Sequence, residues 1–440
     1  MIADPQTKRA SVRALGCRLN QYELTAIADR LNIAGYQVVP FGEPADLGVI
    51  NTCTVTNEAD AKSRNVIRRF IRANPQAVTV VVGCYSQVGA SSVAEIPGVD
   101  YVIGNQDKMN LLEYIGEEKT DRPVIVRERI DRNDFSLSIN GDSPFEWRAN
   151  LKVQDGCDFM CSFCIIPFAR GRARSRAFDN LMEEARSLAD RGVREVILTG
   201  VNIGTYQSQG YDFLGMVESL ASVAGLVRIR ISSIEPTTIP EELFPLMADP
   251  GHSLLPYLHI PLQAGCDSTL VAMKRKYQLD EVTAFIRKAN DLVPNLCIGT
   301  DLMAGFPGET NDHFEQTCRT FLEHPFAYSH VFTFSERTGT PAASSINQVP
   351  MQERRRRSDR LRILSASKRH DFYEAQVGRE ARILIEDPKQ GCWPAYTENY
   401  VRVLFDSGRP DLANRLASVR LVRARPEHVE AELLEVLDHT

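Results

Sequence analysis

The sequence lacks long apolar segments and has no excess of positive charge. Apolar runs such as Val78–Val82 are far shorter than the ~20 residues that a membrane-spanning helix needs, so we expect no membrane-embedded part. The first ten residues, MIADPQTKRA, lack the apolar core of a secretory signal, which predicts a cytoplasmic protein. The 51 Lys and Arg against 57 Asp and Glu give a net charge of −6, so any surface for nucleic acid must be local.

The composition is that of an ordinary globular protein. Hydrophobic residues make up 43% and charged residues 25% of the 440 residues, which excludes wholesale disorder, and this length predicts two to three domains. There are ten cysteines, and we expect no secretory signal. Thiols in such a chain are more typical of metal binding or catalysis than of a disulfide framework.

Residues 1–118 alternate strand-like and helical segments. We expect strands at Ser11–Leu15, Leu47–Thr52 and Val78–Val82, helices over about Gln21–Ala34 and Glu58–Ala73, and two weaker units through Tyr101–Gly104 to about Gly116. This alternation predicts an open parallel α/β domain. The polar segment 119–146 has no clear periodicity and is interpreted as a linker that could carry one strand.

Residues 147–374 repeat the alternation with longer units. About six strand–helix units predict a partial (β/α) barrel, whose ligands bind in the loops after the strands. The expected strands are Leu151–Gln154, Glu195–Thr199, Val227–Ser232, Tyr257–Pro261, Ile298–Met303 and His330–Phe334, and a charged helix is expected over Met351–Ala375. Residues 375–440 switch to short strand-like runs, Ala381–Ile385, Tyr400–Leu404, Val419–Ala424 and Ala431–Val436, which predict a small all-β domain.

Three cysteines, Cys157, Cys161 and Cys164, follow the first strand of the predicted barrel with C-x3-C-x2-C spacing. We call them the barrel trio. Three thiolates in one loop can hold three corners of a [4Fe–4S] cluster and leave one iron open for a substrate. Structural zinc is the alternative, but zinc prefers four ligands, and the next His or Cys is as far away as His252.

Three other cysteines, Cys17, Cys53 and Cys84, are far apart in the sequence. We call them the N-terminal trio. Each follows one of the first three predicted strands, and the carboxyl ends of parallel strands meet at one edge of a sheet, where ligands bind. The alternative is that each is a small buried hydrophobic residue. We predict a second three-thiolate cluster, and assign no role to the other four cysteines.

The barrel trio, with the aromatic Phe163 before its third cysteine, resembles the radical S-adenosylmethionine (SAM) superfamily. The resemblance implies that SAM binds the open iron and that electron transfer from the cluster cleaves it. The loops expected to contact SAM follow predicted barrel strands, where barrel ligands bind. The cofactor residues are Phe163, Gly200, Asn202, Ser233, Glu235, Gln263 and Gly305. For Gly305, in GFPGET, a simple turn before a helix is an equal alternative.

Over essentially its whole length the chain resembles the radical SAM methylthiotransferase family. The matching text includes GCRLNQYE, NTCTVTNEADAKSR, GCDFMCSFCIIPFARGRARSR, HIPLQAGCDSTLVAMKRKY, TDLMAGFPGET, FSERTGTPAA and YTENYVRV, the last similar to a TRAM domain. NTCTVTNEAD and SSIEP resemble the MtaB branch, which modifies C2 of N6-threonylcarbamoyladenosine next to the anticodon of tRNA. Sister branches act on an isopentenylated adenosine in tRNA or on an aspartate of a ribosomal protein.

The resemblance implies a reaction that uses two [4Fe–4S] clusters and two SAM molecules per turnover. The N-terminal cluster would carry the inserted sulfur, and the barrel cluster would activate the C2–H bond. Acid–base chemistry does not suffice for this bond, since no neighbouring group stabilises a carbanion. The implied partners are a tRNA anticodon stem-loop, an external electron donor and a sulfur source, and we expect a monomer with no membrane association.

Basic residues beside the barrel trio are candidates for RNA contacts. Arg170, Arg172, Arg174 and Arg176, together with Tyr400 and Arg402 of the tail and the run Arg354–Arg357, could contact phosphates or bases. A solvated charged face is the alternative for each run. From Ala375 onward there are 9 Lys and Arg against 11 Asp and Glu, whereas an RNA-binding domain is usually basic. A protein methylthiotransferase, and a non-catalytic Fe–S protein that binds RNA, therefore remain as alternatives.

Overall fold

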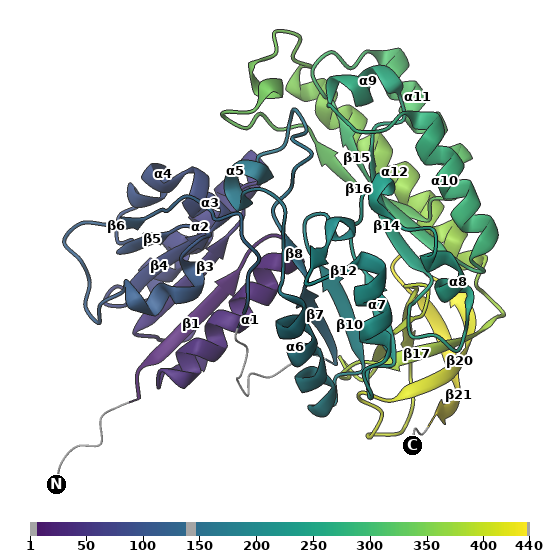
Figure 1. Ribbon diagram of the computed structural model, residues 1–440, viewed down its shortest axis with the longest axis horizontal. Coiled ribbons are helices and arrows are strands. Elements are labelled where there is room, and N and C mark those ends of the chain that lie inside the picture. Colours follow the sequence, from purple (N-terminus) through teal and green to yellow (C-terminus); the bar gives the residue numbers. More distant parts are fainter. Residues whose placement is uncertain (1–6, 138–146, 438–440) are drawn as a thin grey trace.

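The computed structural model describes residues 7–137 and 147–437. Its N-terminal part is a six-stranded parallel sheet in the order β2-β1-β3-β4-β5-β6, which confirms the predicted open α/β arrangement (Figure 1). The strands are β1 (Arg9–Ala14), β2 (Gln37–Val39), β3 (Leu47–Thr52), β4 (Val78–Gly83), β5 (Tyr101–Ile103) and β6 (Val124–Val126). β6 lies in the segment interpreted as a linker and forms the edge of this sheet beside β5.

Helices cover both faces of this sheet. They are α1 (Arg18–Ile33), α2 (Asn57–Ala73), α3 (Cys84–Val88), α4 (Ala90–Ala94) and the 3-10 helix η1 (Lys108–Glu113). Every residue of β3 and β4 is buried, as expected for continuous apolar runs at the centre of a parallel sheet. α1 lies between the N-terminal sheet and the first barrel strand (Figure 1), so its residues can reach both parts of the protein.

The central part is a six-stranded partial barrel. Two parallel three-stranded sheets, β13-β10-β7 and β14-β15-β16, are joined by bridges such as Ser233 to His259. The strands are β7 (Arg148–Lys152), β10 (Glu195–Thr199), β13 (Arg228–Ile231), β14 (Tyr257–Gln263), β15 (Cys297–Ala304) and β16 (Tyr328–Thr333). All six were expected, although β7 begins three residues before the predicted strand.

Helices and short elements connect the barrel strands. The helices are α5 (Ile166–Arg170), α6 (Phe178–Asp190), α7 (Phe213–Ala221), α8 (Leu243–Ala248), α9 (Asp267–Ala272), α10 (Leu279–Leu292), α11 (Asn311–Glu323) and α12 (Met351–Glu374). The shorter elements are β8 (Gln154–Asp155), β9 (Arg174–Ser175), β11 (Gln207–Ser208), β12 (Tyr211–Asp212), η2 (Ile203–Thr205), η3 (Pro236–Thr238) and η4 (Pro341–Ser344).

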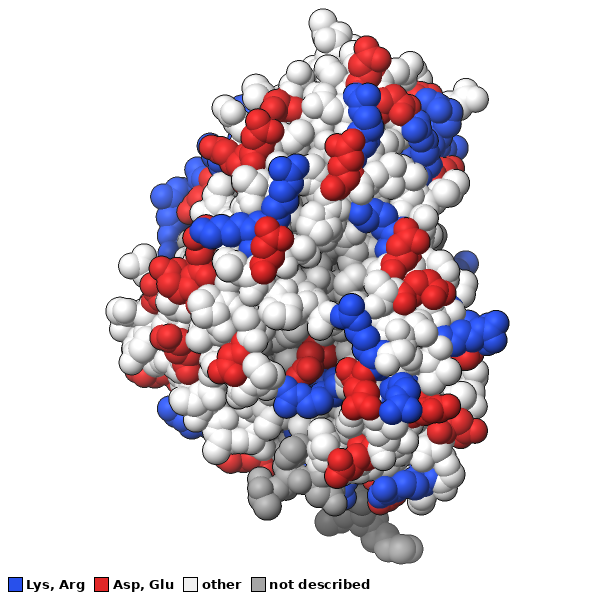
Figure 2. Space-filling model, turned by 90° about the vertical axis from the view of Figure 1, so that its right-hand side faces the viewer, with Lys and Arg blue, Asp and Glu red and all other residues white. Residues whose placement is uncertain are grey.

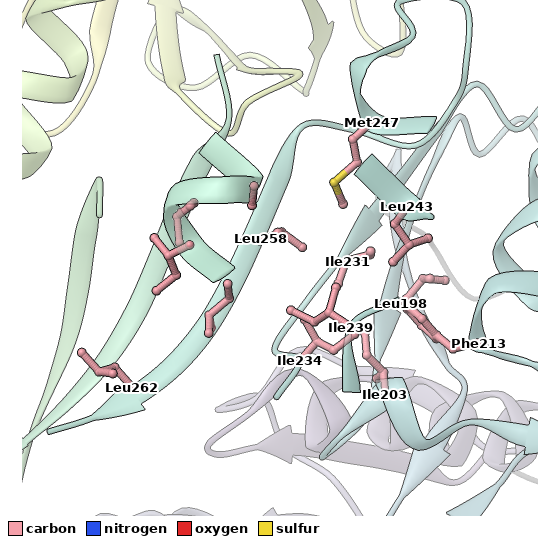
Figure 3. Close-up of a cluster of buried hydrophobic side chains, with 14 of the residues drawn as sticks. Leu198, Ile203, Phe213, Ile231, Ile234, Ile239, Leu243, Met247, Leu258 and Leu262 are labelled. Atoms are coloured by element: carbon pink, nitrogen blue, oxygen red, sulfur yellow. The ribbon is translucent and has the colours of Figure 1, made fainter. Parts of the chain in front are cut away.

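The main hydrophobic core lies between the barrel strands and their helices. Leu198 of β10, Ile231 of β13 and Leu258 of β14 pack there with Phe213 and Met247 from the helices (Figure 3). Successive residues of a strand point to opposite faces. Glu195 and Arg230, which alternate with these apolar residues, therefore face the interior of the barrel, where they form an ion pair. This alternation separates an apolar outer layer from a polar lumen.

The C-terminal part is a closed five-stranded barrel in the order β17-β18-β19-β21-β20. Its strands are β17 (Glu380–Ile385), β18 (Trp393–Thr397), β19 (Arg402–Phe405), β20 (Leu416–Ala424) and β21 (Val429–Leu437). The all-β prediction is confirmed with two corrections. β18 was missed, because a proline in WPAYT weakens its strand signal, and β19 begins at Arg402 because Tyr400 has a left-handed backbone, with φ of 66°.

The helices of residues 7–137 and 147–437 include none that is both long and apolar enough to cross a membrane.

Candidate cofactor and substrate site

The N-terminal trio lies at one edge of the N-terminal sheet. Cys17 caps α1, Cys53 follows β3 and Cys84 begins α3 directly after β4. Because β1, β3 and β4 are neighbours in the sheet, the three thiols come from adjacent strand ends, as the sequence predicted.

The backbone packs closely around this trio. Gly16 has φ of 94°, and a Cβ added there would lie 2.8 Å from the Sγ of Cys53, so a side chain has no room between the first two cysteines. Burial, with smaller contributions from the neighbouring Cys84 and Cys17, raises the pKa of Cys53 to about 12. Thiols in this setting are held as thiolates when a metal coordinates them, because the metal displaces the proton.

The barrel trio lies in the loop between β8 and α5. Burial raises the pKa of Cys157 to about 11 and that of Cys164 to about 12, and Cys161 raises both, which places the three thiols within electrostatic reach of one another. The backbone N–H of Phe159 donates to the Sγ of Cys157 at 3.5 Å. Met160 has a left-handed backbone with φ of 53°, which turns the loop between the first two cysteines.

Both trios suit a cluster better than a single ion. In the described ranges, no three His, Cys, Asp or Glu side chains meet in the close arrangement that one metal ion requires. A [4Fe–4S] cluster instead takes each thiolate on a different iron, so its ligands stand further apart. Each trio supplies thiols alone, without carboxylates or imidazoles, which is the donor set of an Fe–S cluster.

Arg275 links the barrel trio to a buried carboxylate. Its Nη1 donates to the Sγ of Cys161 at 3.3 Å, and its Nη2 pairs with Glu235 and donates to the carbonyl of Pro261 at 3.0 Å. Burial raises the pKa of Glu235, and Arg275 offsets part of this effect. The sequence analysis identified Glu235 but missed Arg275. Arg275 lies in the segment HIPLQAGCDSTLVAMKRKY, which resembles the family, but no sequence pattern marks this residue individually.

The loop after β10 offers an unpaired donor for a ligand. Gln154 Oε1 accepts hydrogen bonds from the backbone N–H groups of Val201 and Asn202, and a Cβ at Gly200 would lie 3.0 Å from the same oxygen. The side-chain Oδ1 of Asn202 accepts from Thr238 at 3.0 Å, while its Nδ2 is buried and has no partner. A buried amide donor without a partner is costly, so this group fits a polar ligand such as SAM.

The other residues expected to contact SAM take part in packing or have unusual backbone conformations. Phe163 packs edge-on against Phe306 with ring centroids 6.4 Å apart, and Gln263 ends β14 with φ of 70°. Ser233 bridges the two sheets of the barrel. A Cβ at Gly305 would lie 2.3 Å from the side chain of Arg354, so the packing favours the structural turn that was its alternative.

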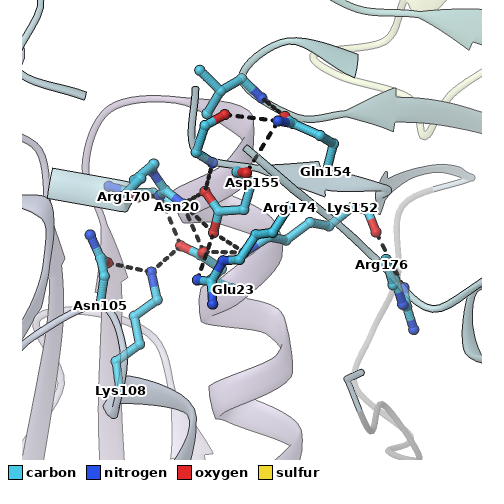
Figure 4. A network of polar contacts seen from close by, with 12 residues as sticks. Asn20, Glu23, Asn105, Lys108, Lys152, Gln154, Asp155, Arg170, Arg174 and Arg176 are labelled. Carbon is cyan, nitrogen blue, oxygen red and sulfur yellow. Dashed lines mark hydrogen bonds and ion pairs between the residues drawn. The ribbon is translucent and has the colours of Figure 1, made fainter. Parts of the chain in front are cut away.

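A buried network of charges connects the two parts that carry the trios (Figure 4). Glu23 of α1 accepts from Lys108 at 2.5 Å, from Lys152 at 2.8 Å and from Arg170 at 3.0 Å. Asp155, two residues before the first barrel cysteine, accepts from Arg170 at 3.0 Å and from Lys152 at 2.6 Å. Three cations therefore share two carboxylates away from solvent.

The same network reaches the N-terminal trio. Asn105 donates to the Sγ of Cys84 at 3.5 Å and to the carbonyl of Ala169 in α5 at 2.5 Å. α5 begins two residues after Cys164 and packs against α3, whose first residue is Cys84 (Figure 1). The loop that holds the barrel trio thus continues directly into the surroundings of the N-terminal trio.

A cavity of about 440 Å³ opens beside the N-terminal trio. All three parts of the chain line it, with Cys17 and Arg18 from the first, Arg148 from the barrel, and Tyr396 and Tyr400 from the C-terminal part. Its volume lies within the range of about 300–1,000 Å³ typical of small-molecule sites. A ligand in this cavity would touch a residue of the N-terminal trio.

Comparisons with known proteins show similarity along most of the chain. The Radical SAM superfamily matches residues 151–321, and the uncharacterized protein family UPF0004 matches residues 9–104. The chain is 37% identical to the threonylcarbamoyladenosine tRNA methylthiotransferase MtaB of Bacillus subtilis over 96% of each chain. It is 33% identical to the tRNA-2-methylthio-N(6)-dimethylallyladenosine synthase of Paraburkholderia phymatum over 98% of each chain. The chain belongs to the radical SAM methylthiotransferase family.

A solved structure supports the fold of this methylthiotransferase. The radical SAM methyltransferase TsrM of Kitasatospora setae superimposes with a TM-score of 0.57 over 76% of this chain and 75% of that one, at 15% identity. At this identity the similarity concerns the fold alone. It supports the fold of the partial barrel, which lies in the region matched by the Radical SAM superfamily.

The structure changes the expectation for the basic residues of the methylthiotransferase. Arg170 and Arg176 are buried in ion pairs with Glu23 and Glu184, so neither presents its charge to RNA at the surface. Arg174 is mostly buried near Asp155. These arginines were expected at an RNA surface because sequence alone does not reveal their distant acidic partners.

Other candidate RNA residues differ in exposure. Arg172 is partly exposed and Arg402 is exposed, so both remain available to a phosphate. Tyr400 is mostly enclosed in the cavity wall, while Arg354 and Arg357 are buried in the α12 contacts. The face shown in Figure 2 carries intermixed acidic and basic side chains without a continuous basic area. Any RNA contact on that face would therefore be local.

Proposed function

We propose that this protein is a tRNA methylthiotransferase that inserts a methylthio group at C2 of N6-threonylcarbamoyladenosine beside the anticodon. Its proposed cofactors are SAM and two [4Fe–4S] clusters. The observation that carries the proposal is the pair of all-thiol trios on either side of one buried interface, in a chain that matches tRNA methylthiotransferases along its length. One trio would suffice for SAM cleavage alone, whereas sulfur insertion needs a second metal-bound sulfur site.

The residues of the chain have distinct proposed roles. The barrel trio holds the cluster that binds SAM, and Arg275 donates to the Sγ of one of its thiolates at 3.3 Å, which stabilises negative charge on that sulfur. Asn202 offers its unpaired amide to SAM, beside the Gln154 oxygen that fixes the loop backbone. When bound, the clusters and SAM supply the one-electron chemistry that an unactivated C–H bond requires.

The N-terminal trio would hold the auxiliary cluster at the wall of the cavity. Cys17 lines this cavity, so a base placed there would lie next to a sulfur site. Residues of the barrel, the N-terminal part and the C-terminal part line it together and can position the base. We propose a tRNA anticodon stem-loop as the macromolecular substrate, with an external electron donor and sulfur source.

Iron counting on anaerobically reconstituted protein tests the two-cluster proposal. The unchanged protein should bind about eight irons per chain, and a triple Ala variant of either trio about four, because each cluster holds four. Cys392→Ser is the matched control, since this exposed cysteine belongs to neither trio. Eight irons in a triple variant, or four in the unchanged protein, would contradict the proposal.

Nucleoside analysis tests the reaction. Cells that lack the gene should lose 2-methylthio-N6-threonylcarbamoyladenosine from digested tRNA, and the gene should restore it. The N-terminal triple variant should still cleave SAM but form no methylthio product, whereas the barrel variant should do neither. If the cells instead lose 2-methylthio-N6-dimethylallyladenosine, the protein modifies dimethylallyladenosine in tRNA. Unchanged tRNA nucleosides would favour a protein substrate.

A further inference from the structure

A buried cluster with more guanidinium groups than carboxylates reaches the cavity beside Cys17 through Arg148. Glu195, which is completely buried, is the shared partner of three guanidinium groups, from Arg148 at 3.0 Å and from Arg228 and Arg230 at 2.8 Å. Glu386 also pairs with Arg148, so two carboxylates face three guanidinium groups. Buried charges without full compensation are costly, so such an excess is typical of a site that receives an anion.

One of these guanidinium groups has a free donor. Arg148 lines the cavity and is 9% exposed. Its Nε donates to Glu195 and its Nη1 donates to Glu386 at 3.0 Å, but its Nη2 is buried and has no hydrogen-bond partner. A buried charged donor without a partner loses the hydrogen bonds that it would make in water, and a ligand oxygen would restore them.

A second guanidinium group enters the cavity from the N-terminal part. Arg18 is the residue after Cys17, and its Nη2 donates to the hydroxyl of Tyr400 at 2.8 Å. Tyr400 stacks on Tyr396 with ring centroids 4.9 Å apart, and Arg148 lies over Tyr396 at 4.3 Å. Two arginines from different parts of the chain therefore contact the same pair of stacked tyrosines.

The pKa of the Tyr400 phenol is affected by the nearby guanidinium groups. Burial alone would raise its pKa, but Arg18, Arg148 and Arg230 more than offset this effect, so its pKa lies below the ordinary value. The wall also contains a carboxylate, Glu386, which occupies only the Nη1 side of Arg148. The balance at the phenol is positive despite Glu386. The backbone of Tyr400 is left-handed, a strained conformation that often marks a ligand site.

We propose that this cavity binds the carboxylate of the threonylcarbamoyl substituent, with Arg18 and the free Nη2 of Arg148 as the donors that select it. This inference rests on the proposed function and deepens it. Threonylcarbamoyladenosine carries a carboxylate, whereas the dimethylallyl group of the sister substrate is uncharged and apolar. Arginine is suited to carboxylates because its planar donors match their geometry. The cavity therefore accounts for substrate choice by charge.

Binding measurements with modified RNA test this inference. Fluorescence anisotropy would follow labelled anticodon stem-loops bound to anaerobically reconstituted protein without SAM, so that no turnover occurs. The three RNAs carry threonylcarbamoyladenosine, its methyl ester, or dimethylallyladenosine. Neutralising the carboxylate as the ester should weaken binding to the unchanged protein about ten-fold to a hundred-fold, because hydrogen bonds between charged groups are worth about 1.5–3 kcal/mol.

Variants identify the donors. Arg18→Met should weaken binding of the acid about ten-fold or more and leave binding of the ester nearly unchanged, while Arg18→Lys should lose less. Arg69→Met, at an exposed position of α2, is the control for the loss of one charge. Glu386→Gln removes the carboxylate from the wall and should strengthen binding of the acid but not of the ester.

The outcomes separate this inference from the proposed function. If the protein methylthiolates threonylcarbamoyladenosine but binds acid and ester equally, the carboxylate site is wrong and the function stands. If Arg18→Met weakens acid and ester alike, Arg18 contacts RNA in general, and its role in selection is refuted. If dimethylallyl RNA is the one that is bound and modified, the proposed function itself is wrong.

Discussion

Replacement of Glu23 by Gln tests whether the buried charge network holds the two cysteine-bearing parts together. Glu23 is completely buried and accepts hydrogen bonds from Lys108, Lys152 and Arg170. The variant leaves Asp155 as the remaining carboxylate for these three cations. Removing one partner of a buried ion pair typically costs about 3–5 kcal/mol, because an uncompensated charge stays behind. We expect a loss of this size in the free energy of unfolding.

Urea denaturation of the apoprotein, followed by circular dichroism, measures this loss, and hydrogen exchange locates it. Faster exchange should concentrate in α1, η1 and α5, the elements that the network joins. Glu58→Gln is the matched control, since Glu58 pairs with Lys62 at the surface and such pairs contribute little. If Glu23→Gln is no more destabilising than Glu58→Gln, the network does not stabilise the interface and the reasoning fails.

The effect of Glu23→Gln should also depend on pH in a defined direction. Burial raises the pKa of Glu23, but Arg170, Lys108 and Lys152 lower it more, so it lies well below the ordinary value. A carboxyl group with a depressed pKa in the folded state contributes its stability fully above its unfolded pKa of about 4.3 and loses it below. The stability difference between protein and variant should therefore narrow as the pH falls below about 4.

Three further changes have expected outcomes. Leu198→Ala, in the main core, should lower the free energy of unfolding by about 2–5 kcal/mol in the same denaturation assay. A loss below about 1 kcal/mol would mean that the core repacks to fill the space left by the leucine side chain. Arg275→Met should leave the iron content unchanged but lower the reduction potential of the barrel cluster, because a hydrogen bond to a cysteine sulfur is lost. Redox titration followed by electron paramagnetic resonance measures this potential. An unchanged potential would show that this contact does not tune the cluster. Arg337→Met removes donors to Asn57, Thr54 and Asp60, so the start of α2 should exchange amide hydrogens faster while the C-terminal barrel does not change.

The two cysteine trios could be found from the sequence, for different reasons. The barrel trio is local, so its spacing alone indicates a cluster loop. The N-terminal trio is not local, but each cysteine follows a predicted parallel strand, and the geometry of such sheets brings strand ends together. Their placement at one sheet edge agrees with this reasoning, whereas their occupation by clusters stays a prediction until iron is counted.

The interpretation of the basic residues shows what sequence patterns do not reveal. RGRARSR, residues 170–176, has the composition of a solvated or RNA-binding segment, yet Arg170 pairs with Glu23, 147 residues earlier, and Arg176 pairs with Glu184. Such pairs depend on how the chain packs in three dimensions, which the local sequence pattern does not encode. The same holds for Arg275, whose contact with Cys161 spans 114 residues.

By itself, the sequence determined the order of the three parts, the strand–helix alternation, the six cysteines and the family. These features follow from local periodicity, spacing and motif, which neighbouring residues carry. Only the tertiary structure decided which charges are buried, which donors remain unpaired, and that Arg18, Arg148 and Tyr400 from three separate segments line one cavity. The physical reason is that burial and pairing depend on the packing of segments that are distant in the sequence.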